Sequence, residues 1–160
     1  YSVMLGYWEQ PDKTAEAIDA ARWMHTGDLA TMDADGYVNI TGRLNDMIIR
    51  GGENISPREI EEFLYTHPDV RDVQVIGVPD ARLGEEIMAW IQRRPGSSEL
   101  TAEDVRAFAT GKLAHYKVPR YVWTVDEFPM TPSGKVRKVE MRKVAIQQLG
   151  LSELAATRHA

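Results

Sequence analysis

The sequence contains no cysteine, which excludes thiol catalysis, thiolate metal sites and disulfide bonds. No apolar run approaches the length that a membrane-spanning helix needs. The first residues, Tyr1-Ser2-Val3-Met4, lack the basic start and the long apolar stretch of a signal peptide, and we expect a cytoplasmic protein. The net charge of −5 argues against a nucleic-acid binder, whose binding surface is normally basic.

Two kinds of catalytic pattern are also missing. The histidines are scattered and show no metal-ligand spacing; they are His25, His67, His115 and His159. No serine lies in a nucleophile-elbow motif. We therefore expect no metal site within this chain and no serine-hydrolase site.

The first part of the chain predicts one helix and one hairpin. Helix formers over 11–21 predict a short helix. The runs 24–32 and 37–41 predict two strands around a turn in which Gly36 supplies a positive φ. Residues 42–52 predict a linker that runs into a short strand.

The second part predicts a small α+β domain. Two helix starts carry the pattern of a capping box: Ser56 with Glu59, and Thr101 with Asp104. The other expected elements are strands over 70–78, 86–92 and 121–125 and a helix over 139–149. This order suits a short mixed or antiparallel sheet flanked by helices.

A domain boundary is expected near Asn45. Residues 1–44 hold too little structure to bury a core, so we interpret them as the trailing strands of a larger preceding domain. Residues 45–150 would form the small domain, and 151–160 a frayed tail. The lack of a methionine at position 1 also suggests that the chain begins inside a longer protein.

The most informative segment is 131–138, which reads TPSGKVRK. It places Lys135 on a loop stiffened by a proline and loosened by a glycine, so that the ammonium group could reach a phosphate or a carboxylate. A basic loop is more often only a solvated loop. Two other unusual segments precede it in a set order: 23–28, which reads WMHTGD, and 42–55, which reads GRLNDMIIRGGENI.

Together the three segments resemble the C-terminal signature of the adenylate-forming enzymes, which are acyl-CoA synthetases, luciferases and peptide-synthetase adenylation domains. The segments 46–55 and 62–68 most resemble medium- and long-chain fatty acid ligases. The resemblance implies that residues 45–150 are the lid domain of such an enzyme and that its own N-terminal adenylating domain is the partner.

The resemblance also implies a reaction in two halves. A fatty acid and ATP give acyl-adenylate and pyrophosphate, and coenzyme A then takes the acyl group and releases AMP. Mg²⁺ is implied beside ATP, held mostly by residues outside this chain. The family's Ser/Thr/Gly-rich phosphate loop is absent here, so this chain alone should be inactive.

Three residues are candidates for the nucleotide site and the hinge. A carboxylate such as Asp28 can accept hydrogen bonds from both hydroxyls of a ribose, although a lone aspartate after Thr-Gly more often caps a turn. The guanidinium of Arg43 suits ribose and phosphate oxygens, or it could pair with a surface aspartate. The resemblance assigns Asp28 and Arg43 to the nucleotide and Asn45 to the hinge, where the family usually has Asp or Lys; Asp46 could share that role.

Lys135 is the candidate catalytic residue. Bringing a carboxylate to the α-phosphate of ATP joins two anions, and a lysine between them would lower that electrostatic cost. The alternative is a solvated lysine. We expect the neighbouring Arg137 and Lys138 to face solvent or the partner domain.

Four residues are candidates for coenzyme A. One interpretation of Gly52 is a tight turn only, but bare backbone also allows a narrow ligand to pass, and the resemblance places the pantetheine arm there. Tyr116, Lys117 and Arg120 could hold the nucleotide end of coenzyme A, or they could simply be cations at a helix end. Leu83 falls where some family members place an adenine-stacking aromatic.

We interpret the pairs 61–62 and 85–86, all glutamates, as exposed.

Two other classes of protein stay open. One is a different adenylating enzyme, luciferase-like or a peptide-synthetase module; the short tail after Leu149 contains no carrier domain, which counts against the modular version. The other is a noncatalytic binding module that kept the lid fold. The presence of Lys135 disfavours this second class.

Overall fold

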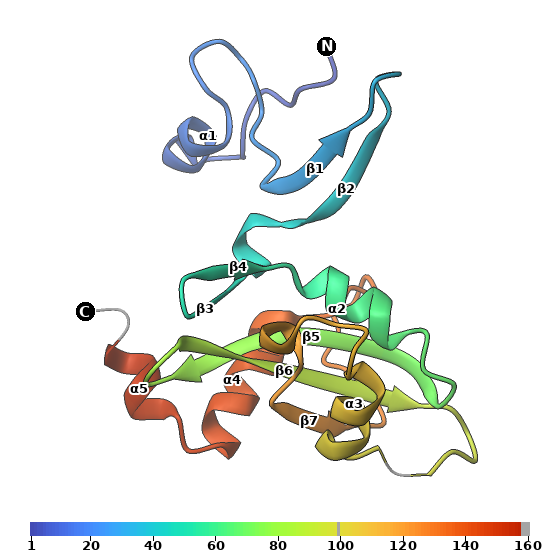
Figure 1. Cartoon of the computed structure of the whole chain (residues 1–160). Coiled ribbons are helices and arrows are strands. Elements are labelled where there is room, and N and C mark those ends of the chain that lie inside the picture. The colour runs from blue at the N-terminus through green and yellow to red at the C-terminus, as the bar shows by residue number, and fades with distance from the viewer. Residues whose placement is uncertain (99, 158–160) are drawn as a thin grey trace. The chain divides into compact units, whose positions relative to one another are not determined.

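The computed structural model describes residues 1–98 and 100–157. The chain divides into two compact units, Tyr1–Asn45 and a second that begins at Asp46 (Figure 1). The domain limits of 1–44 and 45–150 stay a prediction, but this division falls beside them.

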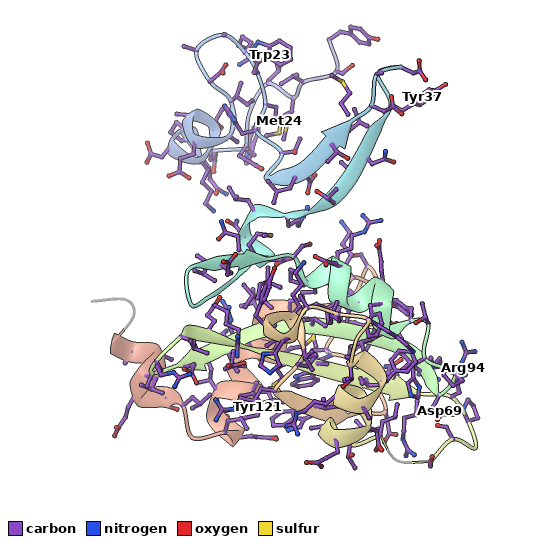
Figure 2. All side chains as sticks on the ribbon, viewed as in Figure 1. Trp23, Met24, Tyr37, Asp69, Arg94 and Tyr121 are labelled. Atoms are coloured by element: carbon purple, nitrogen blue, oxygen red, sulfur yellow. The ribbon has the colours of Figure 1, made fainter. Side chains whose placement is uncertain are left out.

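The first unit holds one helix and one hairpin. Helix α1, Pro11–Ala17, is shorter than expected because Ile18 is extended and bridges Met24. Strands β1, Asp28–Met32, and β2, Val38–Arg43, pair antiparallel. Large apolar side chains stay exposed on this unit, including Trp23 and Tyr37, each 73% exposed (Figure 2).

The second unit is a mixed sheet between helices. Its strands are β3 (Ile48–Arg50), β4 (Glu53–Ile55), β5 (Val70–Asp80), β6 (Gly84–Arg93) and β7 (Tyr121–Thr124). Its helices are α2 (Pro57–Leu64), α3 (Ala102–Ala109), α4 (Lys138–Gln148) and α5 (Ser152–Thr157), with a 3-10 turn at His115–Lys117. The strand order is β4-β3-β6-β5, and β7 joins β6 in parallel while the other pairs are antiparallel. The predicted α+β fold is confirmed.

Two apolar clusters lie on opposite faces of the sheet. One joins α2 and α3 to alternate residues of β5 and β6, such as Val75 and Ala89. The other joins α4 to the residues between them, such as Ile76 and Trp90. Figure 1 accordingly shows α4 and α5 on the other side of the sheet from α2. Because both faces are covered, β5 and β6 are buried on both sides.

The ends of the two capped helices differ. Thr101 and Asp104 form the predicted capping box at α3. Ser56 makes no side-chain capping bond at α2, so the predicted capping box is wrong there, and the carboxylate of Glu59 pairs with Lys117 instead. Pro57 does occupy the first turn as expected.

The second unit also contains two elements that the sequence did not predict. Strand β4 forms a two-residue hairpin with β3 across Gly51 and Gly52, both with positive φ. Helix α5 lies within the segment expected to fray, and Leu151, just before it, packs on the α4 cluster.

The prediction of exposed acidic pairs was wrong for three of the four glutamates. Glu85 and Glu86 are 4% and 1% exposed, and the side chain of Glu61 is 15% exposed. Each is hydrogen-bonded to an arginine or a lysine, as a buried charge requires. Only Glu62, with 63% of its side chain exposed, fits the expectation.

Candidate functional site

The β1–β2 hairpin brings the two predicted nucleotide-binding residues face to face. Asp28 and Arg43 are opposite each other in the strand register, and Arg43 Nε donates to Asp28 Oδ1 at 3.1 Å. The Thr26 hydroxyl accepts the Asp28 N–H, and the Gly27 carbonyl accepts the N–H of Leu44 at 2.8 Å. The pair thus presents a carboxylate and a guanidinium from a fixed hairpin. Its assignment to the ribose stays a prediction.

The predicted hinge residue lies where the two units meet in the sequence. Asn45 is exposed, in the 3-10 turn Leu44–Asp46, and is the last residue of the first unit. Its role as a pivot stays a prediction.

Lys135 lies on a small hairpin that fixes its backbone and exposes its side chain. The Thr131 N–H donates to the Lys135 carbonyl at 2.8 Å, and the Lys135 N–H donates to the Thr131 hydroxyl at 3.0 Å. Gly134, with φ of 80°, makes the turn, and Met130 bridges Val136. Within 1–98 and 100–157, the Lys135 ammonium has no hydrogen-bond or ion-pair partner. It therefore offers an unpaired positive charge from a rigid base.

The expectation that Lys138 faces outward was wrong. Its Nζ lies 2.7 Å from Glu61 Oε1, and only 22% of its side chain is exposed. The residue begins α4, whose packing on the sheet carries its side chain toward α2. Arg137 does remain exposed, and it pairs with Glu140 at 3.7 Å.

The Gly51-Gly52 turn lies beside the loop between β5 and β6. The Gly51 N–H donates to the Leu83 carbonyl at 2.8 Å. A Cβ at Gly51 would lie 3.4 Å from the Leu83 side chain, whereas a Cβ at Gly52 would meet nothing within 4 Å. Gly52 therefore faces open space, which leaves room for a ligand beside its backbone.

A pocket of about 620 Å³ adjoins this turn through Leu83. Its ionisable lining comprises four arginines, two carboxylates and one histidine: Arg50, Arg82, Arg106, Arg120, Asp80, Glu86 and His115. Arg50 donates through Nε and Nη2 to the buried Glu86, at 2.9 and 2.7 Å. Arg120 pairs with Asp80 and Arg106 with Glu103, each at 3.3 Å. Arginines still outnumber carboxylates in the lining by four to two, which suits a phosphate-bearing ligand.

Asp80 shapes the rim of this pocket. Its Oδ1 accepts the N–H groups of Arg82 and Leu83 at 2.9 and 2.8 Å, and its Oδ2 accepts from Arg120 Nη1 at 3.3 Å. The bond from the Leu83 N–H, followed by those from Arg82 and by the nearby Arg120, lowers the pKa of Asp80 from 3.8. The rim is therefore held by an ionised carboxylate.

The three predicted residues around Pro119 have separate surroundings. Arg120 lines the pocket, and its guanidinium lies 5.4 Å from the Tyr121 ring centre. Lys117 donates to both oxygens of Glu59 at 2.6 and 2.7 Å, and these bonds raise the pKa of Lys117. Tyr116 is exposed, with Lys117 Nζ 5.6 Å from its ring centre. Only Arg120 of the three lines the pocket.

Sequence reasoning missed Arg50, Glu86 and Arg106 as pocket residues. Glu86 alternates with Met88 and Trp90 along β6, so it shares their buried face. A carboxylate in such a strand needs a cation, and an arginine in another predicted strand was the signal that could have suggested the Arg50–Glu86 pair.

Two features are absent from the residues that the structure describes. In 1–98 and 100–157, no group of three or more histidines, aspartates or glutamates could hold a metal ion. No helix in the same ranges is long and apolar enough to cross a membrane.

Comparison with known proteins finds one family model and similar proteins from several organisms. The family model described as the AMP-binding enzyme C-terminal domain matches residues 59–135. YngI of Bacillus subtilis (strain 168) is 55% identical over 95% of this chain and 28% of its own length. The mitochondrial medium-chain acyl-CoA ligase ACSF2 of Homo sapiens is 51% identical over 94% of this chain and 24% of its own.

Solved structures agree with these relatives. ATP-bound MatB from Rhodopseudomonas palustris matches with a TM-score of 0.82 and 38% identity, over 88% of this chain and 28% of MatB. The amide bond synthetase McbA from Marinactinospora thermotolerans matches with a TM-score of 0.79 and 40% identity, over the same shares.

The fold and these matches define the class: the chain contains the C-terminal domain of the AMP-binding enzymes, to which residues 59–135 belong. The relatives most similar in sequence include medium-chain acyl-CoA ligases. The chain spans about a quarter of the length of these relatives.

Proposed function

We propose that this chain is the C-terminal part of an ATP-dependent acyl-CoA synthetase that acts on a fatty acid. The observation that carries the proposal is the unpaired Lys135 ammonium on a fixed hairpin. In the first half-reaction, a fatty acid carboxylate attacks the α-phosphate of ATP. Lys135 bridges the two anions and stabilises the charge that develops as pyrophosphate leaves.

The hairpin of the first unit holds the nucleotide in the same half-reaction. The second carboxylate oxygen of Asp28 accepts from the ribose hydroxyls, and the guanidinium of Arg43, with 68% of its side chain exposed, contacts ribose and phosphate oxygens. Mg²⁺ would accompany ATP, held mostly by residues outside this chain.

The second half-reaction uses a different part of the lid. The pantetheine arm of coenzyme A passes the bare backbone at Gly52, and the nucleotide end lies against the arginine-lined pocket with Arg120. Tyr116 offers an exposed ring beside it. The Lys117 ammonium is already paired with Glu59, so Lys117 would support the site by holding that carboxylate and not by contacting coenzyme A.

One lid can serve both halves if it rotates between them. Lys135 and Gly52 come from separate hairpins of the second unit, and both would have to reach the same acyl carbon in turn. Rotation about Asn45, with Asp46 as the alternative pivot, delivers Lys135 first and Gly52 second. The N-terminal adenylating domain, of which this chain would hold only the trailing strands in residues 1–44, is the surface on which the lid moves.

A second candidate is an adenylating enzyme that passes the acyl group to an amine. The likeness to the amide bond synthetase McbA favours it. It shares the first half-reaction with the ligase and differs only in the acceptor, so the arginine-lined pocket would have no phosphate to bind.

The test uses the full-length protein with saturated fatty acids of graded chain length. The ligase predicts acid-dependent exchange of labelled pyrophosphate into ATP, and acyl-CoA with AMP when coenzyme A is added. Exchange followed by amide formation, with no thioester, would support the second candidate. A folded full-length protein with no exchange would contradict both.

A further inference from the structure

Strand β5 has an open edge that two helices cover with side chains. Among the described strands, β5 pairs only with β6. Residues 73, 75 and 77 alternate along β5, so their backbone groups point in one direction. The Val75 N–H and the Gly77 carbonyl both bond to side chains of helices, and that direction is therefore away from β6.

The first of these side chains is Glu61 of α2. Its Oε1 accepts the Val75 N–H at 2.8 Å and Lys138 Nζ at 2.7 Å. The helices α2 and α4 lie on opposite faces of the sheet, so the Glu61–Lys138 ion pair joins them around the edge of β5. Because this pair is partly buried and Glu61 also accepts a backbone N–H, its two side chains are held in a single arrangement, unlike those of an exposed ion pair.

The second attachment lies one helical turn further along α4. Arg142 donates to the Gly77 carbonyl at 2.6 Å and to Glu85 at 2.5 Å. Glu85 also accepts the Ile49 N–H at 2.8 Å. A Cβ at Gly77 would lie 3.0 Å from both Arg142 and Glu85, so the bare glycine leaves room for this crossing.

The Lys135 hairpin is joined directly to this anchored helix. The Arg137 N–H donates to the Pro129 carbonyl at 2.8 Å, which closes the base of the hairpin, and Lys138 follows as the first residue of α4. Val136 also packs on the α4 cluster. The position of the hairpin base is therefore tied to the position of the first turn of α4.

We propose that Glu61 and Lys138 are positioning residues for the adenylation half-reaction, because their ion pair fixes the helix start from which Lys135 projects. The proposal rests on the proposed function of Lys135. In this proposal the Glu61–Lys138 pair affects the adenylation rate without touching the nucleotide. A displacement of about 1 Å in a catalytic group can cost on the order of 100-fold in rate.

The experiment measures both half-reactions of the full-length protein carrying Lys138→Met. Adenylation is followed by pyrophosphate exchange, and thioester formation is started from preformed acyl-adenylate. We expect adenylation to fall roughly 10- to 100-fold, with the thioester half within about twofold of the unmodified protein. Lys138→Arg, which keeps the charge, should restore most of the adenylation rate. The matched control is Lys143→Met, because Lys143 has 68% of its side chain exposed on the same helix, and it should change neither half.

A second variant separates positioning from loss of stability. Lys138→Met leaves the Glu61 carboxylate half-buried without its cation, which should lower the melting temperature. Adding Glu61→Gln removes that charge but keeps an oxygen for the Val75 N–H. The double variant should regain the melting temperature while adenylation stays low, since the tie to α4 is still missing.

The decisive comparison is made in a Lys135→Ala background. If Lys138 acts through Lys135, Lys138→Met should cause little further loss of adenylation there. The same fold-loss in both backgrounds, or an equal fall of both half-reactions, would overturn the positioning role. Normal adenylation in Lys135→Ala alone would instead overturn the proposed function, whereas a slow Lys135→Ala with an unaffected Lys138→Met would overturn only the present inference.

Discussion

At the scale of single residues, the two functional corners of the lid differ in what they expose. Lys135 exposes a charge on a hairpin held by two bonds to Thr131. Gly52 exposes bare backbone with open space where a side chain would be. In the proposed function, the charge of Lys135 would serve the step in which two anions meet, and the bare backbone at Gly52 the step in which the pantetheine thiol enters.

Replacing Lys135 with alanine in the full-length protein should slow adenylation by roughly two or more orders of magnitude, because it removes a contact made to the transition state. Thioester formation from preformed acyl-adenylate should be largely spared. Pyrophosphate exchange and single-turnover thioester assays measure the two halves. An equal fall in both halves would refute this role for Lys135.

Replacing Gly52 with leucine should have the opposite effect. Pyrophosphate exchange should persist while thioester formation drops, because the side chain enters the open space beside the turn. Gly52→Ala is the control: at a φ of 89° it carries the same backbone strain, on the order of 1 kcal/mol, without the bulk. Equal thioester rates in the folded alanine and leucine variants would remove Gly52 from the path of coenzyme A.

At the scale of elements, two basic residues of the segment 115–120 look equivalent in the sequence but have different surroundings in the fold. Arg120 lines the pocket, whereas both oxygens of Glu59 hold the Lys117 ammonium. Arg120→Ala should therefore raise the KM for coenzyme A about tenfold or more, as for the loss of a charge-assisted contact. Lys117→Met should change that KM much less and lower the melting temperature instead. The reverse pattern in steady-state assays would show that Lys117 is the residue that contacts the ligand.

The turn between β5 and β6 should give the lid a stability that depends on acid pH. The pKa of Asp80 is lowered in the folded protein, so its ionised form stabilises the fold above the unfolded value of 3.8. That contribution is lost as the pH falls through the lower folded pKa. Asp80→Asn should cost about 1 kcal/mol at neutral pH, and the difference in the free energy of unfolding should shrink below about pH 4. Denaturant titrations across this range measure it, and a constant difference would contradict the role given to the charge.

Sequence patterns predicted the elements that depend on local signals. The alternation over 70–78 and the capping pair Thr101 and Asp104 gave β5 and α3 because periodicity and capping are written in neighbouring residues. Strand β4 was missed, since three residues after a Gly-Gly turn are too few to show a period. Glu85 was assigned to the surface because its partners, Ile49 and Arg142, lie far along the chain.

The residues of the candidate site also differ in whether local sequence could indicate them. The motifs located Lys135, Asp28 and Arg43, and the strand register brings the last two together. The arginine-lined pocket could not be predicted, because Arg50, Arg82 and Arg106 come from three separate elements and converge only in the folded sheet. The burial of the Lys138 side chain could not be predicted either, because the sequence of a basic run after a loop does not indicate which of its cations is buried.

At the scale of the whole molecule, the division into two units gives the chain a joint at its proposed hinge. The first unit ends at Asn45, and the second begins with the strands that carry Gly52. Exposed apolar side chains on the first unit, such as Trp8 and Trp23 at 85% and 73%, fit a surface that the rest of the longer protein covers. The proposed rotation would therefore turn the second unit about Asn45 relative to the first.

The most direct test of this account measures both half-reactions in full-length Asn45→Pro, with Asn45→Ala as the matched control and circular dichroism to confirm folding. Proline fixes φ and removes a backbone donor, so it should hold the lid in one pose. We predict that the trapped pose forms acyl-adenylate at a near-normal rate, while thioester formation falls at least tenfold below that of the alanine variant. A thioester rate equal to that of Asn45→Ala would contradict a pivot at Asn45, and the same result in Asp46→Pro would contradict the rotating lid itself.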